Sequence, residues 1–275
     1  MQGDLQESVT PRGVAWLDPP VIAAATAAIA ASAWVAAGLF VRWRRREPLL
    51  AWRPHEPVPW SGGDVAAVFL AFLLAASLGQ EVVGDGASLV RRMGIHVAAL
   101  VGATAFAVAV LRARGATWES LGFRGRWPDD LRIAGGAVAL MVAPLLALAG
   151  LLDQLVPYRH PLVDLLTERR DGVALAAVVV SAVIAAPVAE EFFFRRVLQG
   201  WLERRFPEPS GATAIVLSAA AFALAHQGQG LAYVPLFPFG IVLGTVARQT
   251  GSIVACILAH AIFNAISVGI VVLTA

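Results

Sequence analysis

The sequence contains no lysine, so arginine must supply all 21 of its basic residues. It has one cysteine, Cys256, which excludes an internal disulfide and any metal site built from several cysteines. Charged residues make up only 15% of the chain, while 58% of it is apolar and the mean hydropathy is +0.72. A chain so poor in charge is not a soluble domain, and this composition is typical of a protein with several membrane helices.

The sequence also lacks the features of a cleaved signal peptide and of a nucleic-acid-binding protein. No basic segment precedes the first apolar run, so the N-terminus does not resemble a cleaved signal peptide, and residues 1–18 are expected to form a loose polar tail. A basic patch for nucleic acid is not needed to explain the high isoelectric point, because the arginines lie in short loops beside apolar runs. We therefore expect a lipid bilayer as partner and no nucleic acid.

The apolar runs predict an all-α, polytopic membrane bundle of about eight transmembrane helices. The expected spans are residues 21–41, 65–78, 95–111, 131–152, 172–204, 212–226, 231–247 and 252–273. With both termini outside, this alternation puts fifteen arginines on one side and six on the other, as the positive-inside rule requires. We detect no internal repeat.

One stretch of the fifth span is unusual, Ala-Pro-Val-Ala-Glu-Glu-Phe-Phe-Phe-Arg-Arg over residues 186–196. Ionisable groups in or beside a bilayer are costly unless they are paired, so they indicate function by default. In a helix, Glu191 and Arg195 lie four residues apart on one face, in the order that favours an ion pair. Glu190 points elsewhere, and the sequence therefore predicts one neutralised carboxylate beside one that needs another partner.

Polar residues also interrupt the later spans. His226 ends the sixth span, where it could be a satisfied polar cap as readily as a functional group. His260 and Asn264 lie four residues apart in the otherwise apolar last span, and both need hydrogen-bond partners in lipid. Contacts between helices are the alternative explanation for that pair. Cys256, one turn before His260, could be a thiol nucleophile, but a free cysteine is more often a small buried apolar residue.

A carboxylate, two imidazoles and an amide are sufficient for hydrolysis. Glu190 could take a proton from water and later deliver it to a leaving amine. One histidine and Asn264 could donate hydrogen bonds to the developing oxyanion, while the other histidine holds the water or the substrate carbonyl. Alternatively, Glu190, His226 and His260 could bind a divalent metal such as zinc, which would activate the water. The residues do not separate these two mechanisms.

Three motifs in order, Glu-Glu-x-x-x-Arg at 190–195, Phe-x-x-x-His at 222–226 and His-x-x-x-Asn at 260–264, resemble the CAAX prenyl protease and bacteriocin-processing family of intramembrane proteases, also called CPBP or Abi. The resemblance covers about residues 170–275, and Leu-Gly-Phe-Arg at 121–124 is similar to a segment of bacterial members. It implies an intramembrane endopeptidase that cleaves a membrane-associated peptide or protein. Members are commonly labelled metalloproteases, although a metal-free glutamate mechanism has been argued.

The resemblance implies roles for six residues and a place for the protein. The catalytic residues would be Glu190, His226, His260 and Asn264, with Glu191 and Arg195 in support. We expect N-terminal spans and an interfacial connector over 1–130 and a catalytic membrane core over 131–275, in a bacterial inner or plasma membrane. One alternative is a non-catalytic membrane scaffold or immunity protein. The other is a proton-coupled transporter, and the lack of an internal sequence repeat disfavours the transporter.

One expectation conflicts with simple helix geometry. If Asp171 lies at the outer surface, Glu190 is about 28 Å deeper at the rise of an α-helix. A full sixth span would then carry His226 to the opposite side of the membrane. We nevertheless expect the two to meet, because the long fifth helix can slide and the sixth can be short and tilted.

Overall fold

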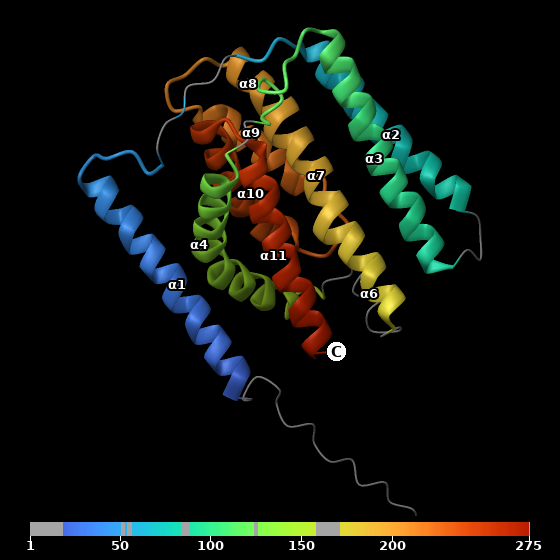
Figure 1. Ribbon diagram of the computed structural model, residues 1–275. Helices are drawn as coiled ribbons and strands as arrows, with labels where there is room; N and C mark the ends of the chain where they lie inside the picture. The colour runs from blue at the N-terminus through green and yellow to red at the C-terminus, as the bar shows by residue number, and fades with distance from the viewer. Residues whose placement is uncertain are drawn as a thin grey trace, which may run out of the picture.

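A computed structural model shows a molecule built from long apolar helices (Figure 1). It describes residues 19–50, 53, 57–83, 88–123, 126–157 and 171–274. The predicted N-terminal tail and Arg124 lie outside these residues. Within the described ranges every regular element is a helix, so the prediction of an all-α fold is confirmed.

The helices follow the apolar runs of the sequence. The first four are α1 (Pro19–Arg44), α2 (Gly62–Val83), α3 (Leu89–Ala113) and α4 (Trp127–Asp153). A long helix runs without a break from Gly172 to Arg205, and the last three are α9 (Ala212–Leu224), α10 (Tyr233–Thr250) and α11 (Ile253–Thr274). The described residues thus contain a helix at each of the eight expected positions.

Not all eight helices qualify as membrane spans. By length and composition five could cross a membrane: Val21–Arg44, Val90–Ala113, Trp127–Asp153, Gly172–Arg205 and Ile253–Leu273. Gly62–Ala75 and Ala212–Leu224 are apolar but shorter. The protein is an integral membrane protein, but the prediction of eight spans is not confirmed.

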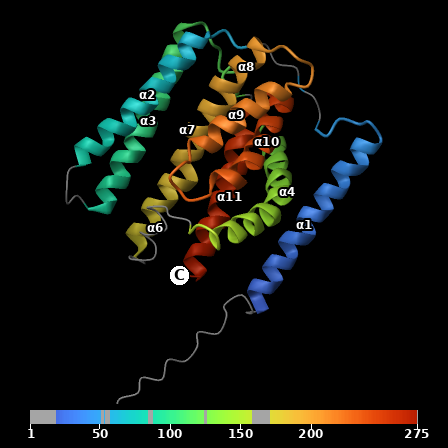
Figure 2. The ribbon, with the colours of Figure 1, turned by 180° about the vertical axis from the view of Figure 1, so that it is seen from behind.

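The long helix and α11 lie at the centre of the bundle. The long helix contacts α3, α9, α10 and α11 along its length, and α11 also contacts α4. Figure 2, from behind, shows α2 and α3 as a pair along one side of the long helix and α1 on the other side of the molecule. There α1 contacts α4, and Ser32 Oγ donates a hydrogen bond of 2.6 Å to the Ala139 carbonyl.

The long helix changes its winding twice. Its parts are α6 (Gly172–Val178), a π-helical segment at Val179–Ala185, α7 (Ala186–Glu191), a second π-helical segment at Phe192–Leu198, and α8 (Gln199–Arg205). Asp171 caps its start by accepting a hydrogen bond from the Ala174 N–H. The 34 residues would span about 50 Å, well over the roughly 30 Å hydrocarbon core. π-Helical segments within α-helices are frequent at functional sites, and here they flank the two glutamates.

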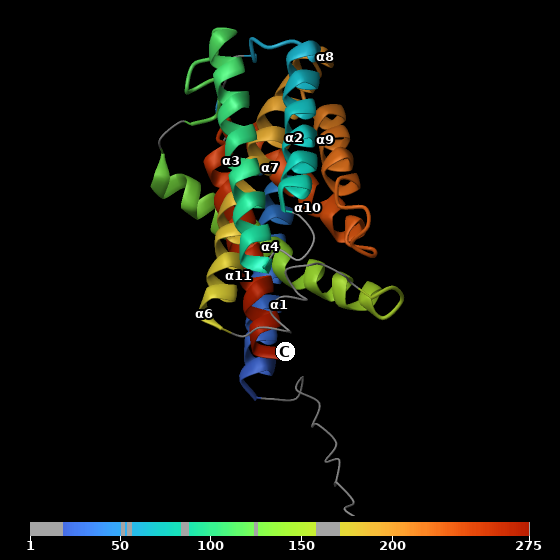
Figure 3. The ribbon, with the colours of Figure 1, turned by 90° about the vertical axis from the view of Figure 1, so that its right-hand side faces the viewer.

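The pair α9 and α10 is the shortest in the bundle. With 13 residues, α9 is about 20 Å long, too short for a full crossing. Figure 3 shows that the chain turns from α9 to α10 part-way along the molecule and not at its end. The sixth helix therefore ends before His226, not at it as the sequence predicted, and the following turn carries this histidine.

Most of the buried apolar side chains form one cluster, and Ala174 and Val178 belong to a second, smaller one. The larger cluster joins Val68 of α2 and Leu111 of α3 to Phe192 of the long helix, Phe222 of α9 and Phe239 of α10, all nearly inaccessible. The phenylalanines after the glutamates fix the contact with the α2–α3 pair, since the Phe193 ring lies 5.7 Å from Phe69 and 5.6 Å from Phe72. These ring contacts attach the long helix to α2 just after its two glutamates.

Candidate active site

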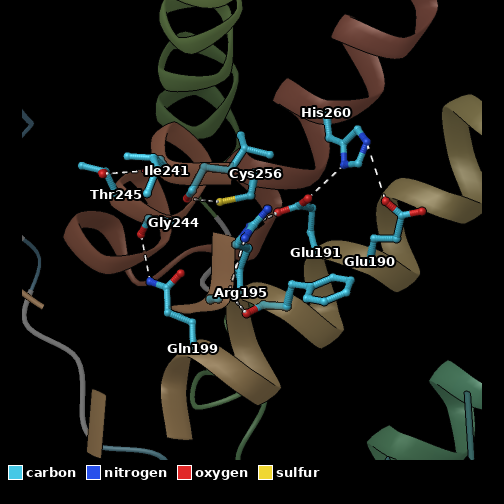
Figure 4. Close-up of polar contacts among 12 residues, drawn as sticks. Glu190, Glu191, Arg195, Gln199, Ile241, Gly244, Thr245, Cys256 and His260 are labelled. Carbon is cyan, nitrogen blue, oxygen red and sulfur yellow. Dashed lines mark hydrogen bonds and ion pairs between the residues drawn. The ribbon is translucent and has the colours of Figure 1, made fainter. Parts of the chain in front are cut away.

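Two histidines from different elements converge on Glu190 of α7. The Nε2 atom of His260 lies 3.9 Å from Glu190 Oε2, and the Nε2 atom of His226 lies 4.0 Å from the same oxygen. Figure 4 shows Glu190 and Glu191 on different sides of the helix, with His260 between them. The fold brings together three groups that the sequence separates by up to seventy residues.

The neighbouring carboxylate has a different environment. Glu191 Oε2 accepts a 2.9 Å hydrogen bond from Arg195 Nε, and neither side chain has any exposed surface. The Arg195 guanidinium also contacts Ser218 Oγ at 3.4 Å and lies 4.8 Å from the centre of the Phe222 ring. The predicted ion pair at positions i and i+4 is confirmed. Glu190, by contrast, is 25% exposed.

Hydrogen bonds at Nδ1 fix the orientation of the His226 and His260 rings. His226 Nδ1 lies 2.8 Å from the Phe222 carbonyl oxygen, which can only accept, so Nδ1 carries the proton. His260 Nδ1 lies 2.9 Å from Glu191 Oε1, and the ionised carboxylate likewise accepts. Each imidazole therefore directs its Nε2 atom toward Glu190, which gives the buried Glu191 a role in orienting His260.

Asn264 owes its position to Pro187. In the π-helical segment the Ala186 N–H donates to the Ser181 carbonyl, so the Ala182 carbonyl would pair with the N–H of Pro187. Proline has no N–H. Asn264 Nδ2 supplies the missing hydrogen bond to Ala182 at 2.8 Å. One N–H of the amide therefore donates to the backbone, and the second can donate to a ligand in the cavity.

These residues line a cavity of about 430 Å³ between α3, the long helix, the α9–α10 connection and α11. Its polar wall includes all four residues for which the sequence predicts catalysis, Glu190, His226, His260 and Asn264. Apolar side chains such as Val178, Val268 and Val271 line the rest. Polar groups converging in a largely apolar cavity are the usual form of a ligand or active site.

Glu190, His226 and His260 are also the predicted metal ligands. Bonds of about 2.0–2.1 Å to a tetrahedral zinc ion place ligand atoms about 3.3 Å apart. The distances of 3.9 and 4.0 Å from Glu190 to the histidines are longer. In the described part of the chain, no group of three or more His, Cys, Asp or Glu side chains is arranged to hold a metal ion. The chemistry of the three donors suits zinc, but their present arrangement does not fit it.

Two other residues, Cys256 and His96, differ from what the sequence suggested about them. Cys256 is fully buried and directs its thiol to the Leu243 and Ser252 carbonyls, at 3.4 and 3.7 Å, and it does not line the cavity. The thiol-nucleophile alternative therefore has no support. His96 of α3 does line the cavity, although the sequence assigned it no role. Its only signal was an imidazole near the start of an apolar helix.

The C-terminal part of the sequence matches a known family model. Residues 172–266 match the family described as Type II CAAX prenyl endopeptidase Rce1-like. This part of the chain is similar to the Rce1-like family. The resemblance indicated by the three motifs is thereby confirmed, and the matched residues include Glu190, His226, His260 and Asn264. No curated protein matches the chain, and no solved structure does.

The Rce1-like region does not include the whole site. It contains the long helix, α9, α10 and most of α11, whereas His96 comes from α3, outside the match. Division of the chain into residues 1–130 and 131–275 stays a prediction.

Proposed function

We propose that the protein is an intramembrane endopeptidase that hydrolyses a peptide bond with water activated by Glu190. The observation that carries this proposal is the convergence of two imidazole Nε2 atoms on a partly exposed carboxylate inside a 430 Å³ cavity. The Rce1-like match of residues 172–266 supports a CAAX-type endopeptidase in general. An amphipathic cavity among apolar helices suits a membrane-associated peptide or protein as substrate.

In the proposed reaction Glu190 takes a proton from water, and the resulting hydroxide attacks the carbonyl carbon of the scissile bond. His226, with Nδ1–H held by the Phe222 carbonyl, accepts a hydrogen bond from the water at Nε2 and orients it. The carbon–nitrogen bond then breaks, and Glu190 delivers its proton to the leaving amine. The products are a carboxylate and an amine, and Glu190 is regenerated.

The oxyanion of the tetrahedral intermediate needs donors placed before the reaction begins. We assign this role to His260 and Asn264, which lie one turn apart on α11 and face the same cavity. In the proposed step His260 donates from Nε2, while Glu191 contacts Nδ1 and Arg195 pairs with Glu191, so that both hold the ring in place. The remaining N–H of Asn264 is the second donor.

The metal-assisted mechanism stays the alternative prediction. Glu190, His226 and His260 would hold a divalent ion such as zinc, which would lower the pKa of bound water and act as a Lewis acid. The observation in its favour is that both histidines present Nε2 while their Nδ1 atoms are anchored, an arrangement common to metal-bound histidines. The observation against it is the spacing of the three donor atoms.

The remaining parts of the proposal concern context. We place the protein in a bacterial inner or plasma membrane, where prenylated substrates are rare, so peptide maturation, signalling and self-immunity are all compatible substrate settings. Two rivals are a non-catalytic scaffold or immunity protein and a proton-coupled transporter. A scaffold does not require that His226 and His260 converge on a carboxylate. A transporter could use Glu190 and the two histidines as a proton relay, and it predicts proton-coupled flux in liposomes and no cleavage.

The test is a proteolysis assay with wild-type and Glu190→Gln protein in liposomes. Both receive a library of membrane-associated peptides, and products are identified by mass spectrometry with and without a chelator. We expect cleavage by the wild type, a loss of at least about 100-fold in the isosteric variant, because the general base is gone, and no effect of the chelator.

Two outcomes would change this picture. Cleavage that persists in Glu190→Gln would remove Glu190 as the base. Loss of wild-type cleavage with chelator, restored by zinc, would establish the metal mechanism instead. If neither protein cleaves any peptide while both complement a cellular phenotype equally, the scaffold explains the protein better.

A further inference from the structure

His96 is an ionisable side chain that α3 contributes to the wall of the cavity. It lies in the first half of an apolar helix that contacts the long helix at α6, at the first π-helical segment and at α7. Its side chain is exposed at the cavity wall and is close enough to Glu190 for the two to interact electrostatically. The position of α3 therefore brings an imidazole from outside the Rce1-like region to the site.

Unlike His226, His260 and Asn264, His96 has no hydrogen-bond partner within the described residues. His226 is anchored by the Phe222 carbonyl, His260 by Glu191 and Asn264 by its bond to the Ala182 carbonyl. Ser267, also in the wall, donates to the Phe263 carbonyl at 3.1 Å. His96 is thus a polar group placed at the cavity without a structural task of its own.

A polar group in a mostly apolar environment costs free energy unless it finds a partner. Simple hydration of His96 by water in the cavity would satisfy it while the site is empty. A bound substrate displaces such water, and His96 then needs a group on the substrate in its place. The backbone of a peptide offers carbonyl oxygens at every residue, and these accept from an imidazole N–H.

We propose that His96 is a substrate-positioning residue that donates a hydrogen bond to a backbone carbonyl of the bound peptide, away from the scissile bond. This inference rests on the proposed function, because it takes the occupant of the cavity to be a peptide. It assigns the α2–α3 pair a part in substrate recognition. His96 takes no part in proton transfer, which Glu190 performs.

The kinetic test compares His96→Ala and His96→Gln with the wild type in the full chain. A hydrogen bond of about 0.5–1.5 kcal/mol made equally to substrate and transition state predicts a KM raised roughly 3–10-fold in His96→Ala, with kcat within about twofold. His96→Gln retains a donor and should recover most of the loss. Thr104→Ala is the matched control, since Thr104 also lies on α3 but bonds its own helix and does not line the cavity.

The partner atom can be identified with peptides in which one carbonyl at a time is replaced by methylene. At the contacted position, this replacement should weaken binding to the wild type and should have little further effect on His96→Ala. Additive losses at every position would overturn the proposal. An unchanged KM in His96→Ala, or a kcat loss of about 100-fold at unchanged KM, would overturn it as well.

A binding assay separates this inference from the proposed function. Glu190→Gln protein is titrated with a fluorescent library peptide, with and without His96→Ala. If the wild type cleaves nothing but His96→Ala still weakens binding 3–10-fold, hydrolysis fails while the role of His96 stands. Equal binding by both proteins refutes the role of His96 whether or not the wild type is a protease.

Discussion

At the scale of single residues, the two adjacent glutamates differ in everything but their chemistry. Glu191 is fully buried, paired with Arg195 and bonded to His260, whereas Glu190 is partly exposed and faces two imidazole nitrogens across a cavity. The cause is the helix itself, because neighbouring residues point about 100° apart. A substitution of Glu191 should therefore mainly lower stability, whereas the same substitution of Glu190 should mainly lower catalysis.

We expect Glu191→Gln to lower the free energy of unfolding by about 3–5 kcal/mol, because it leaves the buried Arg195 without a compensating charge. Glu190→Gln, the same chemical change one residue away, should alter stability by less than about 1 kcal/mol. Thermal and denaturant unfolding in detergent, followed by circular dichroism, measures both. Equal stability of the two variants would contradict the structural role of the Glu191–Arg195 pair.

At the scale of elements, the short helix α9 decides where the site lies. A full-length sixth helix would carry His226 far from Glu190, whereas 13 residues place the turn after α9 part-way along the molecule (Figure 3). The return helix α10 packs closely against α9, and a Cβ atom at Gly240 would lie 2.9 Å from Ala219 Cβ and 3.0 Å from its Cα. This close contact keeps the turn in position.

Gly240→Ala should therefore destabilise the protein by about 1–3 kcal/mol and reduce cleavage, since overpacking pushes α9, and with it the turn that carries His226, away from Glu190. The matched control is Gly135→Ala in α4, where a Cβ would meet nothing within 4 Å and the better helix former should be neutral or slightly stabilising. Unfolding midpoints and relative kcat/KM values give the result. Wild-type activity in Gly240→Ala would show that the site tolerates displacement of α9.

At the scale of the whole molecule, the arginine distribution predicts an orientation. The end of α1 and the connection from α8 to α9 fall on the arginine-rich, cytoplasmic side, and the start of α3 falls on the other side. Figure 1 is consistent with this arrangement, because α8 and the loop after α1 lie at one end of the bundle and α6 and the C-terminus at the other.

Single-cysteine labelling tests the orientation. The buried Cys256 is replaced by alanine, and new cysteines are placed at the exposed positions Glu47, Ser88 and Ser210. In intact cells an impermeant maleimide should label only Ser88→Cys, and permeabilised cells should also show labelling at positions 47 and 210. The reverse pattern would invert the topology and put the arginine-rich loops outside.

Sequence alone determined the membrane class, the helix positions and the Glu191–Arg195 pair, because hydropathy and helical spacing are local properties of the chain. The three motifs also indicated the family and contain four residues of the cavity wall, Glu190, His226, His260 and Asn264. Sequence could not determine that α9 stops short, that Pro187 leaves a carbonyl for Asn264, or that His96 lines the cavity. Those features depend on contacts between distant segments, and only the packing of the helices decides which distant side chains share a cavity.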